Sequence, residues 1–148
     1  MTYEELIAAT AEKIGLDGFA PDDDGVCVLH SDVGEIAILK CTDPLDCVLL
    51  NASVADVPAA ADAALLAALK ANNGFLDMHG ATLAVDAETN RFELSQYAFL
   101  ADLDADSFVA MIERFAASLV DMRKKIEGAK VLKLFAQRSG EWRGSDAR

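Results

Sequence analysis

The chain has 148 residues, of which 53% are hydrophobic and 26% are charged, and its formal net charge is −12. This is enough sequence for one globular core and too little for two comfortable domains. Residues 121–148 carry more basic than acidic side chains, so an acidic body is followed by a basic tail. The acidic body repels phosphate backbones and anionic lipid surfaces, which argues against nucleic acid or a membrane as a partner. Basic or amphipathic protein partners fit better.

The N-terminus lacks the pattern of a secretory signal, because Glu4 and Glu5 stand where a cationic segment and an apolar run are needed. No stretch approaches the ~18 to 20 uninterrupted apolar residues of a spanning helix. We therefore expect a soluble, cytoplasmic protein.

A capping box predicts the first helix, because Thr2 is followed three residues later by Glu5. Apolar residues then recur at helical spacing over Tyr3–Ile14, and Gly15 ends the pattern. Residues 17–25 combine glycine, proline and three successive aspartates, which is typical of a loop.

Three strand-like runs follow, at residues 26–30, 35–40 and 45–51, and they predict an antiparallel meander. In the second run, Ile36 and Ile38 share one face of the strand. Ala37 and Leu39 share the other, so both faces of the sheet are apolar. We expect more apolar sheet surface than the helices of one chain can bury.

A second helix is predicted to begin at Pro58 and to end at residues 72–74, where asparagines and a glycine favour a helix stop. Its apolar stripe consists of Leu65, Leu66 and Leu69. The chain continues with a hairpin formed by residues 81–86 and 91–97.

The last helix is predicted to begin near residues 104–107 and to end at Gly128, with apolar side chains every three or four residues. We therefore divide the chain into an α/β domain over residues 1–128 and a basic, partly disordered tail over residues 129–148. The predicted fold is α+β, in the order α-β-β-β-α-β-β-α, with an antiparallel sheet and three helices.

No pattern of catalytic or metal-binding residues emerges. Asp22–Asp24 lack the alternate spacing and the distant glutamate of a calcium loop, and a solvated loop is the interpretation. Cys27 and His30 point to opposite faces of their strand, and His79 reads as a surface residue. Phosphate-binding and hydrolase motifs are missing, so we expect neither an enzyme nor a cofactor.

The three cysteines, Cys27, Cys41 and Cys47, are odd in number and lack C-x-x-C spacing. All three lie in or beside apolar, strand-like runs. We therefore expect buried free thiols rather than a disulfide framework or a metal site.

Three local patterns occur in sequence order along the chain. They are a leucine-rich helix ending at Asn72, a strand Leu83-Ala84-Val85-Asp86 followed by Thr89-Asn90 and Phe92-Glu93-Leu94, and a helix containing Phe108 and Phe115. Together with the order of elements over about Thr2 to Lys125, these patterns resemble the class I type III secretion chaperones, the CesT-like (Tir chaperone) family.

The resemblance implies a homodimer in the bacterial cytoplasm that uses no cofactor. It would bind the extended N-terminal segment of a secreted effector and keep that effector secretion-competent. In this family the segment winds around the dimer and places apolar side chains in grooves formed by the first helix and the meander. Carried over by position, the groove candidates are Leu6, Ile7, Ile14, Val28, Ile36, Ile38, Val48 and Leu50. The candidates for the dimer interface are Leu65, Leu69, Leu83, Phe92 and Leu94.

Strand addition to a sheet edge agrees with this interpretation, because backbone hydrogen bonds tolerate many sequences while side-chain pockets select among them. The alternative is a YbjN-like module of similar architecture, a regulatory or adaptor dimer without a link to secretion. The tail with Trp142 extends past the family pattern.

Overall fold

The computed structural model describes residues 1–43, 45–74 and 78–146, with the backbone alone from residue 130 onward. Its elements are α1 (Tyr3–Ile14), β1 (Val26–Ser31), β2 (Gly34–Cys41), β3 (Cys47–Asp56), α2 (Asp62–Asn73), β4 (Thr82–Asp86), β5 (Arg91–Phe99), the short 3-10 helix η1 (Leu100–Asp102) and α3 (Ala105–Asp146). The predicted α+β class and the predicted order of helices and strands are both confirmed.

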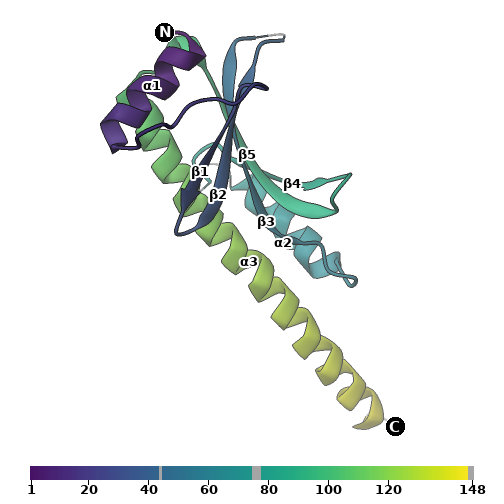
Figure 1. Ribbon diagram of the computed structural model, residues 1–148. Coiled ribbons are helices and arrows are strands. Elements are labelled where there is room, and N and C mark those ends of the chain that lie inside the picture. The colour runs from purple at the N-terminus through teal and green to yellow at the C-terminus, as the bar shows by residue number, and fades with distance from the viewer. Residues whose placement is uncertain (44, 75–77, 147–148) are drawn as a thin grey trace.

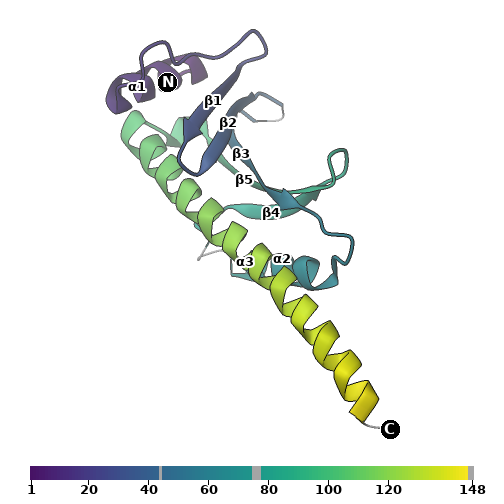
Figure 2. The ribbon, with the colours of Figure 1, turned by 60° about the horizontal axis from the view of Figure 1, so that its bottom comes forward.

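The five strands form one antiparallel sheet in the order β1-β2-β3-β5-β4. The three helices lie together along one face of this sheet, with α3 crossing it diagonally between α1 and α2 (Figures 1 and 2). The fold is therefore a two-layer sandwich of helices on a sheet, and no helix in the described part of the chain covers the second face of the sheet.

The core fills the space between the two layers. Strand alternation turns Ile36, Ile38, Val48 and Leu50 toward the helices, where all four are fully buried. They pack with Leu6 and Ile7 of α1, Phe92 and Leu94 of β5, and Phe108 and Phe115 of α3. Full burial of each such side chain contributes about 1.5–3 kcal/mol, so this face holds the layers together.

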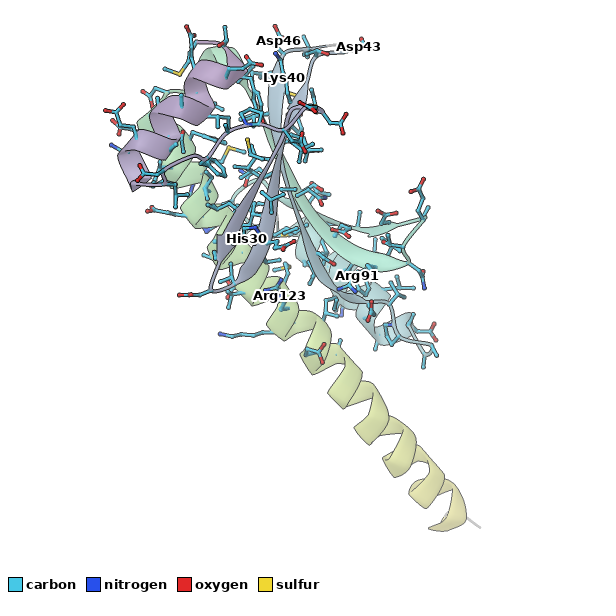
Figure 3. All side chains as sticks on the ribbon, in the orientation of Figure 1. His30, Lys40, Asp43, Asp46, Arg91 and Arg123 are labelled. Atoms are coloured by element: carbon cyan, nitrogen blue, oxygen red, sulfur yellow. The ribbon has the colours of Figure 1, made fainter. Side chains whose placement is uncertain are left out.

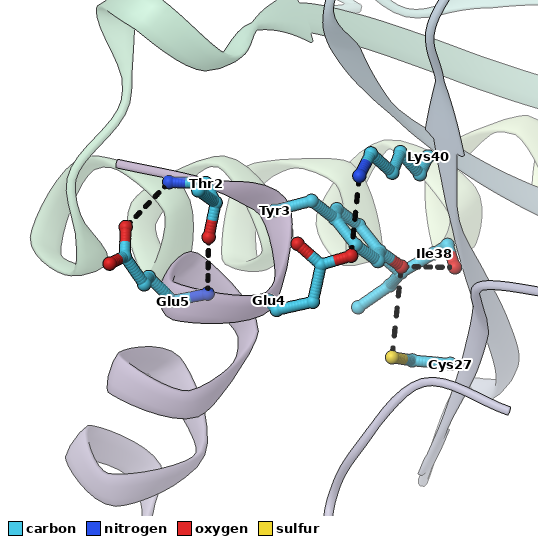
Figure 4. Close-up of polar contacts among 7 residues, drawn as sticks. All are labelled: Thr2, Tyr3, Glu4, Glu5, Cys27, Ile38 and Lys40. Carbon is cyan, nitrogen blue, oxygen red and sulfur yellow. Dashed lines mark hydrogen bonds and ion pairs between the residues drawn. The ribbon is translucent and has the colours of Figure 1, made fainter.

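Helix α1 is fixed to the sheet at its first turn. The Thr2 hydroxyl accepts a hydrogen bond from the backbone N–H of Glu5, and the Glu5 carboxylate accepts one from Thr2, which confirms the predicted capping box. The buried Tyr3 hydroxyl donates to the carbonyl oxygen of Ile38 at 3.0 Å (Figure 4). Burial, followed by contact with the Cys27 thiol, raises the pKa of Tyr3, so the hydroxyl remains a donor.

Helix α3 is fixed through Arg123, which reaches from the helix to the strands (Figure 3). Its guanidinium donates to the carbonyl oxygen of Val33 and, at 3.0 Å, to that of Ser53. Gly34 follows with φ +110°, and a Cβ there would lie 3.2 Å from the guanidinium. The positive φ therefore favours glycine at this turn, and any side chain there would also have to displace the guanidinium.

Three predicted boundaries were wrong. Strand β3 continues to Asp56 because its alternate residues stay buried and pair with β5, and α2 consequently begins at Asp62 rather than at Pro58. Helix α3 passes through Gly128 to Asp146, beyond the sheet (Figure 1). An isolated glycine costs a helix only about 1 kcal/mol, and the residues that follow are mostly good helix formers. The division into residues 1–128 and a tail remains a prediction.

We expect Tyr3→Phe to lower the free energy of unfolding by about 1 kcal/mol, because it removes one buried hydrogen bond while keeping the ring. Urea denaturation followed by far-UV circular dichroism measures this difference. Tyr97→Phe is the matched control, since the Tyr97 side chain is exposed. Equal stability of the two variants would contradict the anchoring role of Tyr3.

Candidate partner-binding surfaces

The uncovered face of the sheet carries an apolar row. Strand register places Val26 opposite Leu39, Leu39 opposite Leu49, and Leu49 opposite Tyr97. Val28 and Tyr97 are 41% and 64% exposed, and the Tyr97 ring packs edge-on against Phe99. This row crosses four strands and forms an apolar surface that the chain itself leaves open to solvent.

Several polar side chains on the rest of the same face hydrogen-bond to one another. The Asn51 amide donates to the Ser95 hydroxyl at 2.9 Å, and Arg91 donates to the Ser53 hydroxyl and to the Asp56 carboxylate. The apolar surface is therefore confined to the half of the sheet that contains β1, β2, the start of β3 and the end of β5.

Strand β1 forms an edge of the sheet. The Val26 N–H and C=O face away from β2, because both bond to Asp22 in the preceding loop. Antiparallel alternation then turns the N–H and C=O groups of Val28 and His30 outward as well. Among the described residues these outward groups have no hydrogen-bond partner, so they can pair with an added strand.

A small pocket lies directly beside this edge. Its volume is about 240 Å³, and it is lined by Leu16, Asp17, Gly18, Phe19, Val28, Leu29 and His30. Leu16 is exposed, and Phe19 packs on the core from the loop after α1. A strand paired with β1 would therefore find an apolar pocket for a side chain next to its backbone hydrogen bonds.

A larger cleft of about 690 Å³ lies where α1 begins. It is lined by Met1, Thr2, Tyr3, Lys40, Leu45, Asp46, Phe99, Leu100 and Ala101. Lys40 pairs with the Glu4 carboxylate at 3.2 Å (Figure 4). Phe99 joins this cleft to the apolar row, so the two surfaces are continuous.

The opposite edge of the sheet is partly closed. The side chain of Asn72, near the end of α2, accepts a hydrogen bond from the Leu83 N–H at 2.8 Å and donates to the Leu83 C=O at 2.7 Å. It takes the place of a neighbouring strand at that position of β4. The sequence indicated only that Asn72 would help to end a helix.

Helix α2 has its large apolar side chains on the outside. Ala64, Ala68 and Ala71 face the core, whereas Leu65, Leu66 and Leu69 are 39%, 52% and 68% exposed. On a helix these leucines share one face, opposite the alanines. We call them the α2 leucine stripe.

Six of the eight predicted groove residues are core residues. Leu6, Ile7, Ile36, Ile38, Val48 and Leu50 are each at most 1% exposed, so no partner can touch their side chains in this structure. Val28 and Ile14 are exposed, at the sheet edge and at the end of α1. The sequence showed two apolar faces on these strands without showing which one the helices cover.

The predicted interface residues also divide into two groups. Leu65 and Leu69 belong to the α2 leucine stripe, whereas Leu83, Phe92 and Leu94 are buried between the sheet and the helices. Tyr97 and Phe99 were missed as surface candidates, because β5 had been expected to end at residue 97 and to pair within its own hairpin.

The structure places the cysteines and His30 on strands β1, β2 and β3. Cys27 is buried beside Tyr3, and burial raises its pKa. His30 is exposed on the edge strand, 3.4 Å from the Glu35 carboxylate. Cys41 and Cys47 are only half-buried free thiols, which corrects the expectation that all three cysteines are buried.

The described part of the chain contains no cluster of three or more His, Cys, Asp or Glu side chains arranged to hold a metal ion. In the same residues, none of the helices combines the length and the apolar character that crossing a bilayer requires.

The fold matches those of several solved structures. A chain of the ExsC–ExsE complex aligns with a TM-score of 0.69 at 19% identity, over 82% of this chain and 90% of that one. A chain of the HopA1–SchA chaperone–effector complex gives 0.64 at 20% identity, over 84% and 93%. A chain of the heterodimeric ExoU–SpcU complex, from the type III secretion system of Pseudomonas aeruginosa, gives 0.63 at 18% identity, over 82% and 98%.

Sequence comparison identifies the family. No curated protein sequence matches the chain. The model of the Tir chaperone protein (CesT) family matches residues 5–123, which is most of the sequence. The chain therefore belongs to the Tir chaperone protein (CesT) family.

Proposed function

We propose that this protein is a type III secretion chaperone of the bacterial cytoplasm. It acts as a homodimer, without enzymatic activity or cofactor, and binds the extended N-terminal segment of a secreted effector to keep it secretion-competent. Family membership supports this function, as do structural neighbours described as chaperone–effector or type III secretion complexes.

The observation that carries the proposal is the β1 edge with its adjoining apolar surfaces. The outward backbone groups of Val28 and His30 offer hydrogen bonds that suit any extended segment. The pocket of Leu16 and Phe19 and the row that ends at Tyr97 select apolar side chains. An extended, partly apolar peptide fits this combination better than a folded partner, whose own backbone groups are already paired.

The α2 leucine stripe supports the homodimer. Three exposed leucines on one helix face form an apolar patch that a soluble chain normally buries against a partner. A second copy presents the same stripe, so a two-fold contact covers both. Helix α2 lies beside β4, and β1 is the other edge of the sheet, so dimerisation through α2 leaves β1 free.

A segment that wraps around a dimer also gains enough contact area to offset the free-energy cost of becoming ordered. Ordering a disordered segment costs about 2–5 kcal/mol or more of the gross interaction energy. One strand pairing and one pocket offset little of this cost. Two copies of the edge, the apolar row and the cleft give the segment a contact area that can exceed it.

Co-expression with the product of a neighbouring gene tests the function. We expect a stable complex with an N-terminal segment of a secreted protein, in a ratio of two chaperone chains to one segment, measured by light scattering on the purified complex. Secretion of that effector should fall when the chaperone is deleted. If deletion leaves its secretion unchanged, an adaptor role without a link to secretion is the better interpretation.

Val28→Pro tests strand addition, because proline removes the outward N–H of β1 while leaving the hydrogen bonds to β2 in place. We expect at least about a fivefold loss of affinity for the captured segment, since an unmade backbone hydrogen bond costs about 1–3 kcal/mol. Calorimetric titration measures it. Val28→Ile keeps the N–H and should bind normally. A folded Val28→Pro protein with wild-type affinity would rule out pairing at Val28.

Leu69→Asp tests the α2 leucine stripe. A charge at the centre of an apolar contact is left desolvated and unpaired, so we expect a folded monomer, measured by size-exclusion chromatography with light scattering. Leu45→Asp makes the same change at an exposed leucine outside α2 and should leave the dimer intact. A dimeric Leu69→Asp protein would place the interface elsewhere.

A further inference from the structure

Cys41 and Cys47 face each other across two neighbouring strands. Cys41 ends β2, Cys47 begins β3, and the sheet register pairs them directly. Both thiols are half-buried on the open face of the sheet, beside Phe99, which is the register partner of Cys47 on β5. The hairpin tip between them carries Asp43 and Asp46 and lies at the end of the sheet next to α1 (Figure 3).

The backbone geometry suits a covalent link between these two residues. Because Val26 turns its backbone groups away from β2, alternation makes Leu39 and Leu49 a hydrogen-bonded pair. Cys41 and Cys47, two residues further along each strand, are then also such a pair. Their Cα atoms lie about 5.5 Å apart in this arrangement, within the roughly 4.4–6.8 Å that a disulfide spans.

The Cys41 and Cys47 thiols also interact electrostatically. Burial, and next the charge of the Cys41 sulfur, raises the pKa of Cys47. Two thiolates are therefore unfavourable side by side, whereas a disulfide removes both charges. Cys27 is separate from this pair, because it lies on the covered face against Tyr3.

We propose that Cys41 and Cys47 form a reversible redox site, oxidised to an intramolecular disulfide by exchange with a small disulfide such as oxidised glutathione. This modification goes beyond the proposed chaperone function and does not depend on it. One cysteine thiolate attacks a sulfur of glutathione disulfide, which forms a mixed disulfide and expels one glutathione thiolate. The second cysteine thiolate attacks the protein sulfur of this mixed disulfide and expels the other. Two electrons pass to glutathione, and the two thiol protons end on the two glutathiones.

The link acts where the hairpin meets the 690 Å³ cleft. Leu45 and Asp46 line that cleft, and the Asp46 carbonyl oxygen accepts a hydrogen bond from the Leu100 N–H at 3.1 Å. A disulfide joins the strand ends on both sides of these residues and so fixes one wall of the cleft. Disulfides at exposed positions are the more readily reduced ones, which suits a reversible modification.

The test uses the full-length chain in glutathione redox buffers of increasing potential. We expect the mass to fall by two hydrogens, with peptide mapping placing the bond between Cys41 and Cys47, and dithiothreitol restoring both thiols. Cys27→Ser should behave like the wild type. Cys41→Ser and Cys47→Ser lack the second thiol and should stop at the glutathione mixed disulfide.

The rate of oxidation gives a second measurement. Because the Cys47 pKa is raised, its thiolate fraction is small at neutral pH, and the rate should increase up to about tenfold per pH unit from pH 7 to 8. A wild-type chain that accumulates stable mixed disulfides at both cysteines, or only cross-links between chains, would overturn the proposal. So would a disulfide that involves Cys27.

Discussion

The structure depends on one constraint, which is that the sheet is apolar on both faces while the helices cover only one. Ile38 and Leu50 point into the helical layer and are fully buried, whereas Leu39 and Leu49, on the same two strands, point to the open side. Among the described residues all three helices lie on the same side of the sheet, with α3 packed against α1, α2 and β3 and with α2 beside β4, so none of them covers the open face. The excess apolar surface is thus a direct consequence of the strand sequences, and it is the surface that the proposed partner would cover.

Helix α2 shows the same excess in another form. Alanines fill the narrow space against the sheet and α3, where a larger side chain would push the layers apart, and leucines take the exposed side. Each exposed leucine leaves unrealised the roughly 1.5–3 kcal/mol that full burial of its side chain would contribute. In the homodimer proposed above, contact with the second copy would supply this burial.

The sequence was sufficient to predict the fold class, the order of helices and strands, and the features that local residues determine. The Thr2 capping box, the strand alternation and the hairpin around Asn90 all depend on neighbouring residues and were predicted correctly. The sequence did not predict which face of the sheet the helices cover. Periodicity shows that Ile38 and Leu39 point in opposite directions without showing which side the helices occupy. The same limit applied to α2, whose apolar stripe was visible although its direction was not. The β1 edge and the role of Asn72 at β4 depend on the order of strands in the sheet, which local sequence does not encode.

An open strand edge invites pairing between identical copies, and charge opposes that outcome here. The loop that precedes β1 holds Asp22, Asp23 and Asp24, and the turn after it holds Asp32, all of them exposed. Two such edges brought together would place these carboxylates near one another, and desolvation would strengthen their repulsion. A segment that is basic, or that has fewer acidic residues, meets no such barrier. A basic segment is also attracted to the acidic body, which raises its local concentration near the edge. Among the described residues the α2 leucine stripe has no comparable run of exposed aspartates beside it. In the proposed assembly, self-association therefore uses α2, and the β1 edge is kept for a different chain.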